Sequence, residues 1–183
     1  RPAIACTWIA GKTPRSIAVA DIDQAVEFAA SLQRTGGAGW TRPAAEFAPT
    51  LADLVEQIGT RCALLLKARD ESALHASMAA FVQEELLSLV KMPPRDVPDF
   101  ERILSPSDFG FHNAIRRPDG SLVFIDFEYF GWDDPAKLVS DFLWHPAMNL
   151  SEAHRQRFVS GIAEALSNRE VLARRLPVAY PLY

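Results

Sequence analysis

Residues 104–128 read LSPSDFGFHNAIRRPDGSLVFIDFE, and this stretch decides the fold. Its centre, Pro118-Asp119-Gly120, favours a tight turn between two strands. A hairpin that turns there begins near Asn113 and ends near Asp126, thirteen residues further along the chain. Because Asp108 stands on the loop just before the first strand, the hairpin is expected to bring two carboxylates and an amide together.

These side chains suit phosphoryl transfer. That reaction needs a carboxylate that orients the attacking hydroxyl and accepts its proton. It also needs oxygen ligands that hold Mg²⁺ on the nucleotide phosphates. Asp108, four intervening residues and Asn113 repeat the spacing of a kinase catalytic loop.

Together with Ile125-Asp126-Phe127-Glu128-Tyr129, this spacing resembles the aminoglycoside phosphotransferase and choline kinase superfamily. Members of this superfamily are kinase-like phosphotransferases that act on small molecules. The resemblance implies an α/β (α+β) fold like the C-terminal lobe of a protein kinase, mostly helical, with a small β-hairpin that carries the site. The specific motifs occupy residues 105–141, and the string at 126–129 is closest to the choline and ethanolamine kinases.

The resemblance also implies roles for single residues. Asp108 would be the catalytic base, and Asn113 and Asp126 would be the Mg²⁺ ligands. Asp141 would be a structural acid that braces the catalytic loop. ATP would donate the phosphoryl group to a hydroxyl of a small molecule such as an aminoglycoside, choline, ethanolamine or a sugar.

Other side chains near the motif are candidates for contacts around the site. Glu128 is expected either in a salt bridge or beside the substrate, and His112 either in a structural hydrogen bond or against a phosphate. Tyr129 and Trp132 could surround a quaternary ammonium through cation–π attraction, or pack in the core. Asp133 could attract a cationic substrate, or belong to the start of the next helix.

The sequence departs from the superfamily in two respects. Pro106 stands where these proteins usually carry a histidine, and neither a glycine-rich loop nor a Val-Ala-Ile-Lys lysine precedes the motif. Residues 7–11 (TWIAG) resemble the hinge between two kinase lobes. We therefore expect residues 1–12 to form the last strand of an N-terminal lobe with the hinge, and residues 13–183 the helical catalytic lobe. The chain opens on Arg1, so we expect a fragment that is inactive unless extended.

The composition excludes several classes of protein. With 49% hydrophobic residues, the chain has enough apolar side chains for one globular core. Nineteen basic against 23 acidic side chains give a net charge of -4, so no nucleic-acid partner is expected. No apolar stretch approaches the roughly 20 residues that cross a bilayer, so no membrane span is expected. Cys6 and Cys62 form no CxxC pair, and the four histidines show no metal-ligand spacing, which favours a cytoplasmic protein without a transition metal.

Outside the motif, the hydrophobic pattern predicts one strand and several helices. Residues 3–9 read as a strand, Asp21 is expected to cap the first helix, and residues 92–94 (MPP) are expected to end the third. The predicted helices cover residues 21–35, 51–67, 71–89, 135–144 and one or two segments from Ser151 onward.

Two alternatives follow from other features of the sequence. Residues 6–13 (CTWIAGKT) match a P-loop except for its first glycine, which would indicate a nucleotidase. Pro106 would instead suit a kinase-like binding or regulatory module whose chemistry has decayed. Residues 108–110 spell the DFG motif of protein kinases, but Glu101 rather than asparagine stands five residues after Asp96, so we do not assign them that role.

Overall fold

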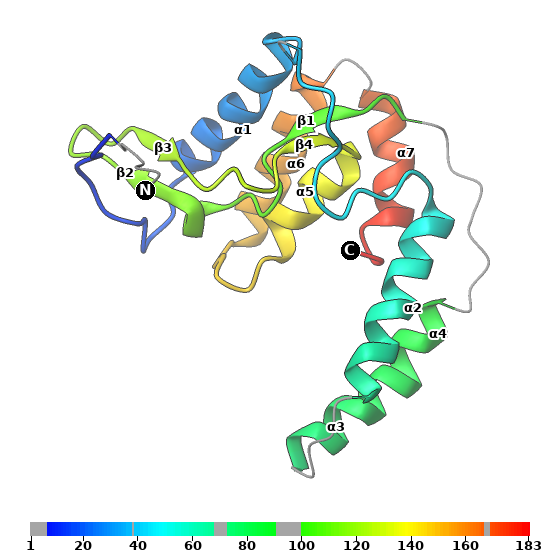
Figure 1. The fold of residues 1–183 in the computed structure, drawn as a ribbon. Helices are drawn as coiled ribbons and strands as arrows, with labels where there is room; N and C mark the ends of the chain where they lie inside the picture. Colours follow the sequence, from blue (N-terminus) through cyan, green and yellow to red (C-terminus); the bar gives the residue numbers. More distant parts are fainter. Residues whose placement is uncertain (1–6, 38, 68–72, 91–99, 167–168) are drawn as a thin grey trace, which may run out of the picture.

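The computed structural model of the protein describes residues 7–37, 39–67, 73–90, 100–166 and 169–183. The helices are α1 (Val19–Arg34), α2 (Leu51–Lys67), α3 (Ala73–Phe81), α4 (Leu87–Val90), α5 (Pro135–Trp144), α6 (Glu152–Ala165) and α7 (Arg169–Ala179), with a π-helical segment at Val82–Leu86 and a 3-10 turn at Phe111–Asn113. The strands are β1 (Ile103–Ser105), β2 (Ala114–Arg116), β3 (Leu122–Phe124) and β4 (Gly131–Asp133). This helix-rich architecture with two small antiparallel sheets is compatible with a kinase-like fold (Figure 1).

The predicted hairpin is present. Strands β2 and β3 pair antiparallel, with Ala114 opposite Phe124 and Arg116 opposite Leu122. The turn closes through a hydrogen bond from the Gly120 amide to the Arg117 carbonyl, 3.0 Å long. Gly120 adopts a left-handed φ of 86°, which glycine reaches without steric cost.

A second sheet, which the sequence analysis did not predict, pairs β1 with β4. Gln33 of α1 borders β1 with two hydrogen bonds, because its amide contacts both the N–H (2.9 Å) and the carbonyl (2.7 Å) of Leu104. On the other side, the backbone of Pro43 and Ala44 lies so close to Gly131 that a side chain there would collide with it. The sheet thus joins three segments that are distant in the sequence.

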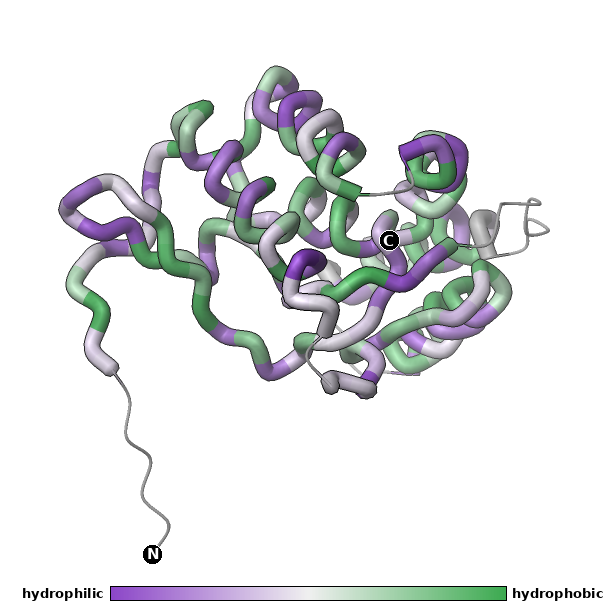
Figure 2. The backbone as a smooth tube through the Cα atoms, turned by 90° about the horizontal axis from the view of Figure 1, so that it is seen from above, coloured by the Kyte–Doolittle hydropathy of each residue, from purple (hydrophilic) through white to green (hydrophobic). Residues whose placement is uncertain are grey.

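Aromatic rings form much of the core between the hairpin and the C-terminal helices. Phe142 of α5 stacks on Phe158 of α6 with ring centroids 3.7 Å apart, and Phe109 contacts both of them and Phe124. Along the helices, apolar stretches alternate with polar ones (Figure 2). One continuous core therefore connects the loop of residues 104–113 to the helical layer.

A buried ion pair fixes α7 against the start of α5. Asp134 caps α5 by accepting a hydrogen bond of 2.8 Å from the Ala136 amide, and Pro135 occupies the first turn as predicted. Arg175 of α7 reaches the same carboxylate at 2.7 Å, and both side chains are almost fully buried. Ser151 caps α6, also as predicted.

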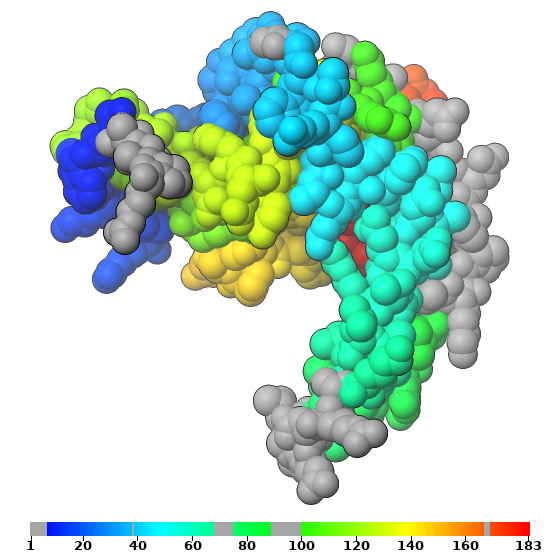
Figure 3. Space-filling model, in the orientation of Figure 1, coloured from blue at the N-terminus to red at the C-terminus, as the bar shows by residue number. Residues whose placement is uncertain are grey.

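Helices α2, α3 and α4, with the π-helical segment, form an arm that projects from the body (Figures 1 and 3). The first turn of α2 packs on the core through Leu51 and Leu54. Further out, Leu64 and Phe81 are exposed. The space-filling view shows an open, concave side between this arm and the hairpin (Figure 3).

Three expectations for local structure need correction or lie outside the described residues. Residues 7–9 do not form a strand, and residues 3–6 and 92–94 lie outside the described part of the chain. Asp21 does not cap α1 from outside, because the helix already begins at Val19. Its carboxylate instead accepts a hydrogen bond of 2.7 Å from the Ala18 amide and binds Arg116 of the hairpin.

The aromatic stack predicts a large difference between two phenylalanines. Phe158→Ala should lower the free energy of unfolding by about 3–5 kcal/mol, because Phe158 is fully buried and its loss leaves a cavity. The control Phe81→Ala, at a side chain that is 54% exposed, should change it by less than about 1 kcal/mol. Urea unfolding of both variants checks this, and equal losses would contradict the packing described here.

Candidate active site

Asp108 lies in a strained turn between β1 and the 3-10 turn. Ser107 and Asp108 have φ angles of 51° and 44°, and Asp126 at the far end of the hairpin has a φ of 66°. Left-handed backbone is uncommon outside glycine and often accompanies function. Of the four such non-glycine residues in the described part of the chain, three lie at this site.

Asn113 is oriented by Asp108. Its side-chain nitrogen Nδ2 donates to the Asp108 backbone carbonyl at 3.1 Å and to the carboxylate oxygen Oδ2 at 3.2 Å. These two bonds identify which end of the amide faces Asp108, so the oxygen Oδ1 faces away from it. An oxygen presented in this way suits a hard cation.

Backbone pairing brings Asp126 next to Asn113. The Ile125 amide donates to the Asn113 carbonyl at 2.9 Å, which extends the hairpin pairing by one step. Asp126 follows directly and is exposed. The structure therefore brings together the three polar residues that the sequence analysis placed at the two ends of the hairpin.

Two histidines contact the Asp108 carboxylate. His112 Nε2 lies 3.2 Å and His145 Nε2 3.6 Å from Asp108 Oδ1, and the two imidazole rings stack with centroids 3.6 Å apart. Gly110 leaves room for the ring of His112, since a Cβ at Gly110 would lie 2.7 Å from its Nδ1. The sequence analysis placed only His112 near the site, because no pattern links the residue after α5 to the loop.

The Tyr129 phenol lies beside the carboxylate of Glu128 and near those of Asp108 and Asp126. The Glu128 carboxylate beside the phenol raises the pKa of Tyr129, and the charges of Asp108 and Asp126 raise it further. Tyr129 is 45% exposed. Both side chains are exposed, so for Tyr129 the structure does not show the core packing that was one of its two alternatives.

Asp141 and Asp133 belong to an internal ion network instead of the open surface. The Lys137 ammonium lies 2.7 Å from Asp141 and 3.4 Å from Asp133. Burial raises the pKa of Asp133 to about 6 and also raises that of Asp141, on which the charge of Asp108 acts in the same direction. Since Asp133 has no exposed surface, we do not retain it as a substrate residue.

The Trp132 side chain also makes contacts within the protein. Its indole N–H donates to the Trp40 carbonyl at 2.6 Å, and its ring packs against Gly37. This agrees with the core-packing alternative considered for it. Among the three expected substrate residues, only Tyr129 is exposed beside the candidate site.

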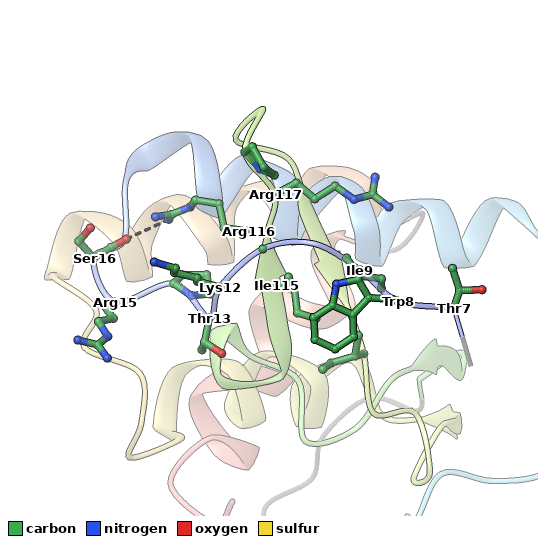
Figure 4. A pocket seen from close by; sticks show the side chains of 14 residues that line it. Thr7, Trp8, Ile9, Lys12, Thr13, Arg15, Ser16, Ile115, Arg116 and Arg117 are labelled. Carbon is green, nitrogen blue, oxygen red and sulfur yellow. Dashed lines mark hydrogen bonds between the residues drawn. The ribbon is translucent and has the colours of Figure 1, made fainter. Parts of the chain in front are cut away.

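A hollow of about 1300 Å³ lies between residues 7–16 and the hairpin. Ile115 and Ile125 contribute apolar surface, and Figure 4 shows the Trp8 indole near Ile115. Lys12 and Arg117 add positive charge. Ile125, which lines the hollow, immediately precedes Asp126 in the sequence, while Asp126 and Asp108 themselves do not line it.

Comparison with known proteins decides the family. The model of the phosphotransferase enzyme family matches residues 1–177. The chain belongs to this family. The expected resemblance to the aminoglycoside phosphotransferase and choline kinase superfamily is thereby confirmed. Neither the comparison with curated proteins nor that with solved structures gave a match.

The P-loop alternative does not fit this phosphotransferase. In a P-loop, the lysine and hydroxyl residue lead directly into a helix. Here the backbone of Lys12 forms an antiparallel β-bridge with that of Arg116, and α1 begins only at Val19.

In the described part of the chain, none of the helices has the length and apolar character needed to cross a membrane.

Two sets of potential metal ligands differ in chemistry. Asp108, His112 and His145 offer ligand atoms that all lie within 4.8 Å of one another, a mixed set that suits a transition metal. Asn113 and Asp126 offer oxygen alone, which suits Mg²⁺. For the cation that assists phosphoryl transfer, the second set is the better fit.

The burial of Asp133 predicts a pH dependence. A pKa of about 6 in the folded state, above the usual 3.8, means that the folded protein holds this proton more tightly. The contribution of Asp133 to stability therefore falls as pH rises from about 4 to about 6, by up to about 3 kcal/mol. Lys137, whose pKa is raised, contributes constantly over this range.

Asp133→Asn should remove this component. Between pH 4 and pH 7, the unfolding free energy of the variant should decline less with rising pH than that of the wild type. Urea unfolding across this range measures both slopes. Parallel curves would show that Asp133 does not titrate with a raised pKa.

Proposed function

We propose that this phosphotransferase transfers the γ-phosphoryl group of ATP to a hydroxyl of a small molecule. The observation that supports this most is the placement of Asp108. Its carboxylate lies in a left-handed turn, in contact with Asn113 and two histidines, beside the hairpin end that carries Asp126.

In this proposal Asp108 orients the acceptor hydroxyl and takes its proton. Asn113 Oδ1 and the Asp126 carboxylate hold Mg²⁺, which neutralises charge on the nucleotide phosphates when it is bound. Positioning accounts for most of the rate in such reactions. The hydrogen bonds of Asn113 to Asp108 support both roles, because one amide links the base to the cation ligands.

The hollow beside the hairpin is the proposed nucleotide site. Ile115 and Ile125 provide an apolar floor for a base, and Trp8 a flat aromatic wall. The cations Lys12 and Arg117 favour an anionic ligand. In this proposal the phosphates would extend from Ile125 toward its neighbour in the sequence, Asp126.

We further propose a kinase-like C-terminal lobe for most of the chain. Residues 13–183 would form this catalytic lobe, and residues 7–12, of which 7–9 form no strand, would serve as the hinge that leads into it. The contact of Gly11 with the backbone of Arg116 supports this division, because residues 7–12 then run along the hairpin as a connection between lobes would. Asp141, paired with Lys137 below the loop, keeps its proposed bracing role.

A cationic acceptor suits the surface around Asp108. Asp126, Glu128 and Tyr129 are all exposed there, and they combine negative charge with an aromatic face. Choline, ethanolamine and aminoglycosides share a hydroxyl near a positive nitrogen. Sugars remain in the test panel because they share the hydroxyl alone.

The second candidate, a module whose chemistry has decayed, rests on Pro106 at the position of the usual histidine. The contacts of His112 and His145 with Asp108 favour an active enzyme instead, because the carboxylate is still held by imidazole groups. Turnover separates the two candidates.

Removing either carboxylate should abolish activity. Asp108→Asn should lower the acceptor-dependent rate by about 10²–10⁴-fold, because the base is lost, and Asp126→Asn should abolish the Mg²⁺-dependent turnover. Glu164→Gln, at an exposed acid of α6, is the control and should keep the wild-type rate. The measurement is ATP consumption by the full natural chain against amino-alcohols, aminoglycosides and sugars.

A decayed module would bind nucleotide and consume none with any acceptor. Full activity in Asp108→Asn or Asp126→Asn would contradict the assignment of these residues. An acceptor-stimulated rate that both substitutions remove would establish the reaction and identify the acceptor class.

The nucleotide site is tested by binding. Ile125→Ala should weaken ATP binding about tenfold, because it removes apolar surface that the base would cover. Leu64→Ala, at a side chain that is 62% exposed on the arm, should leave the affinity unchanged. Calorimetric titration in an Asp108→Asn background avoids turnover, and equal affinities for both variants would place the nucleotide elsewhere.

A further inference from the structure

His145 contacts the proposed base from a separate part of the fold. It follows α5 directly, and its Nε2 lies 3.6 Å from Asp108 Oδ1. His112 approaches the same oxygen at 3.2 Å, and the two rings are nearly parallel, with an angle of 7° between their planes. The carboxylate thus has imidazole neighbours on Oδ1 and Asn113 on Oδ2.

The second nitrogen of His145 fixes the position of the ring proton. Nδ1 accepts a hydrogen bond of 3.2 Å from the Ala147 amide. A nitrogen that accepts carries no proton, so the neutral ring has its proton on Nε2. Burial, and then the neighbouring His112, lower the pKa of His145, which favours the neutral form. The Nε2–H group therefore faces the Asp108 carboxylate.

This tautomer argues against a metal at the same three residues. A protonated Nε2 has no lone pair to offer, and a metal would need that nitrogen because Nδ1 is already used. Within the set of Asp108, His112 and His145, the Nε2–H group of His145 thus faces an acceptor, Asp108 Oδ1, instead of offering a metal a ligand.

We propose that His145 is a positioning residue that holds the Asp108 carboxylate through its Nε2–H group. It would take over the bracing that Pro106 cannot supply, and it would do so from the end of α5. This inference rests on the proposed function, in which Asp108 is the base. His112 lies within hydrogen-bond distance of Oδ1, Asn113 donates to Oδ2, and His145 approaches Oδ1 from a second side at 3.6 Å, so the three side chains restrict the orientation of the carboxylate.

The tautomer can be tested without any activity. In a ¹⁵N-labelled chain at pH 7.5, long-range ¹H–¹⁵N correlation spectra should show His145 as the Nε2–H tautomer. The His145 signals are assigned by their loss in His145→Gln, and Asp108→Ala should shift them. A ring with its proton on Nδ1, or a ring carrying both protons, would overturn the proposal.

Kinetics of three variants then separate positioning from packing. His145→Gln keeps a nitrogen donor at about the reach of Nε2. His145→Asn keeps an acceptor for the Ala147 amide but does not reach Asp108, and His145→Phe keeps the ring stack without a donor. We expect kcat to fall by about 10- to 100-fold in His145→Asn and His145→Phe, with little change in the KM for ATP, and by less than about 3-fold in His145→Gln.

The opposite order, with His145→Phe active and His145→Gln impaired, would assign His145 to packing and overturn the proposal. Equal activity in all three variants would overturn it as well. Failure of the proposed function looks different, since the wild type would then show no turnover with any acceptor while the tautomer spectra still report on the contact with Asp108.

Discussion

The ion pairs of the buried Lys137 ammonium are the interaction that connects the elements around the candidate site. The ammonium lies between the carboxylates of Asp133 on β4 and Asp141 on α5, and Asp133 in turn reaches the hydroxyl of Ser107 at 3.4 Å. Burying two acids without this cation would cost several kcal/mol each. Burial raises the pKa values of both acids, and the charge of Lys137 opposes that rise. With Lys137 in place, the network ties β4 and α5 to the turn that carries the proposed base. This charged network therefore supports the turn from the protein interior, while the Asp108 side chain itself is partly exposed.

Much of this arrangement could be predicted because its causes are local. The turn at residues 117–120 fixes the hairpin, and the hairpin brings Asn113 and Asp126 together whatever surrounds it. The helix at 135–144 begins at Asp134-Pro135, and Ser151 caps the next one, since both signals act within one helical turn. The first helix shows the limit of such signals: the Asp21 side chain can bind the amide before it as well as those after it, and here it binds the earlier one.

The features that escaped prediction depend on contacts between distant segments. Strands β1 and β4 have three residues each, and Gln33 and residues 42–44 supply the partners that their edges need. Trp132 is an aromatic residue of the kind that can bind a cationic substrate, but its indole N–H donates to the Trp40 carbonyl. No spacing in the sequence predicts this hydrogen bond. His145 reaches Asp108 only because α5 ends beside the loop. Each of these follows from packing, so a single sequence contains no period or motif that would reveal it.

Backbone strain at the site explains why so many side chains converge on it. Left-handed residues other than glycine cost about 1–3 kcal/mol each, and Ser107, Asp108 and Asp126 all adopt this conformation. Relaxation of the turn would remove that cost but would also carry the Asp108 carboxylate away from Asn113. The bonds from Asn113, the histidines against Oδ1 and the buried network below offset the strain only when the turn keeps its shape. The contacts that orient the Asp108 carboxylate are thus the same contacts that offset the backbone strain.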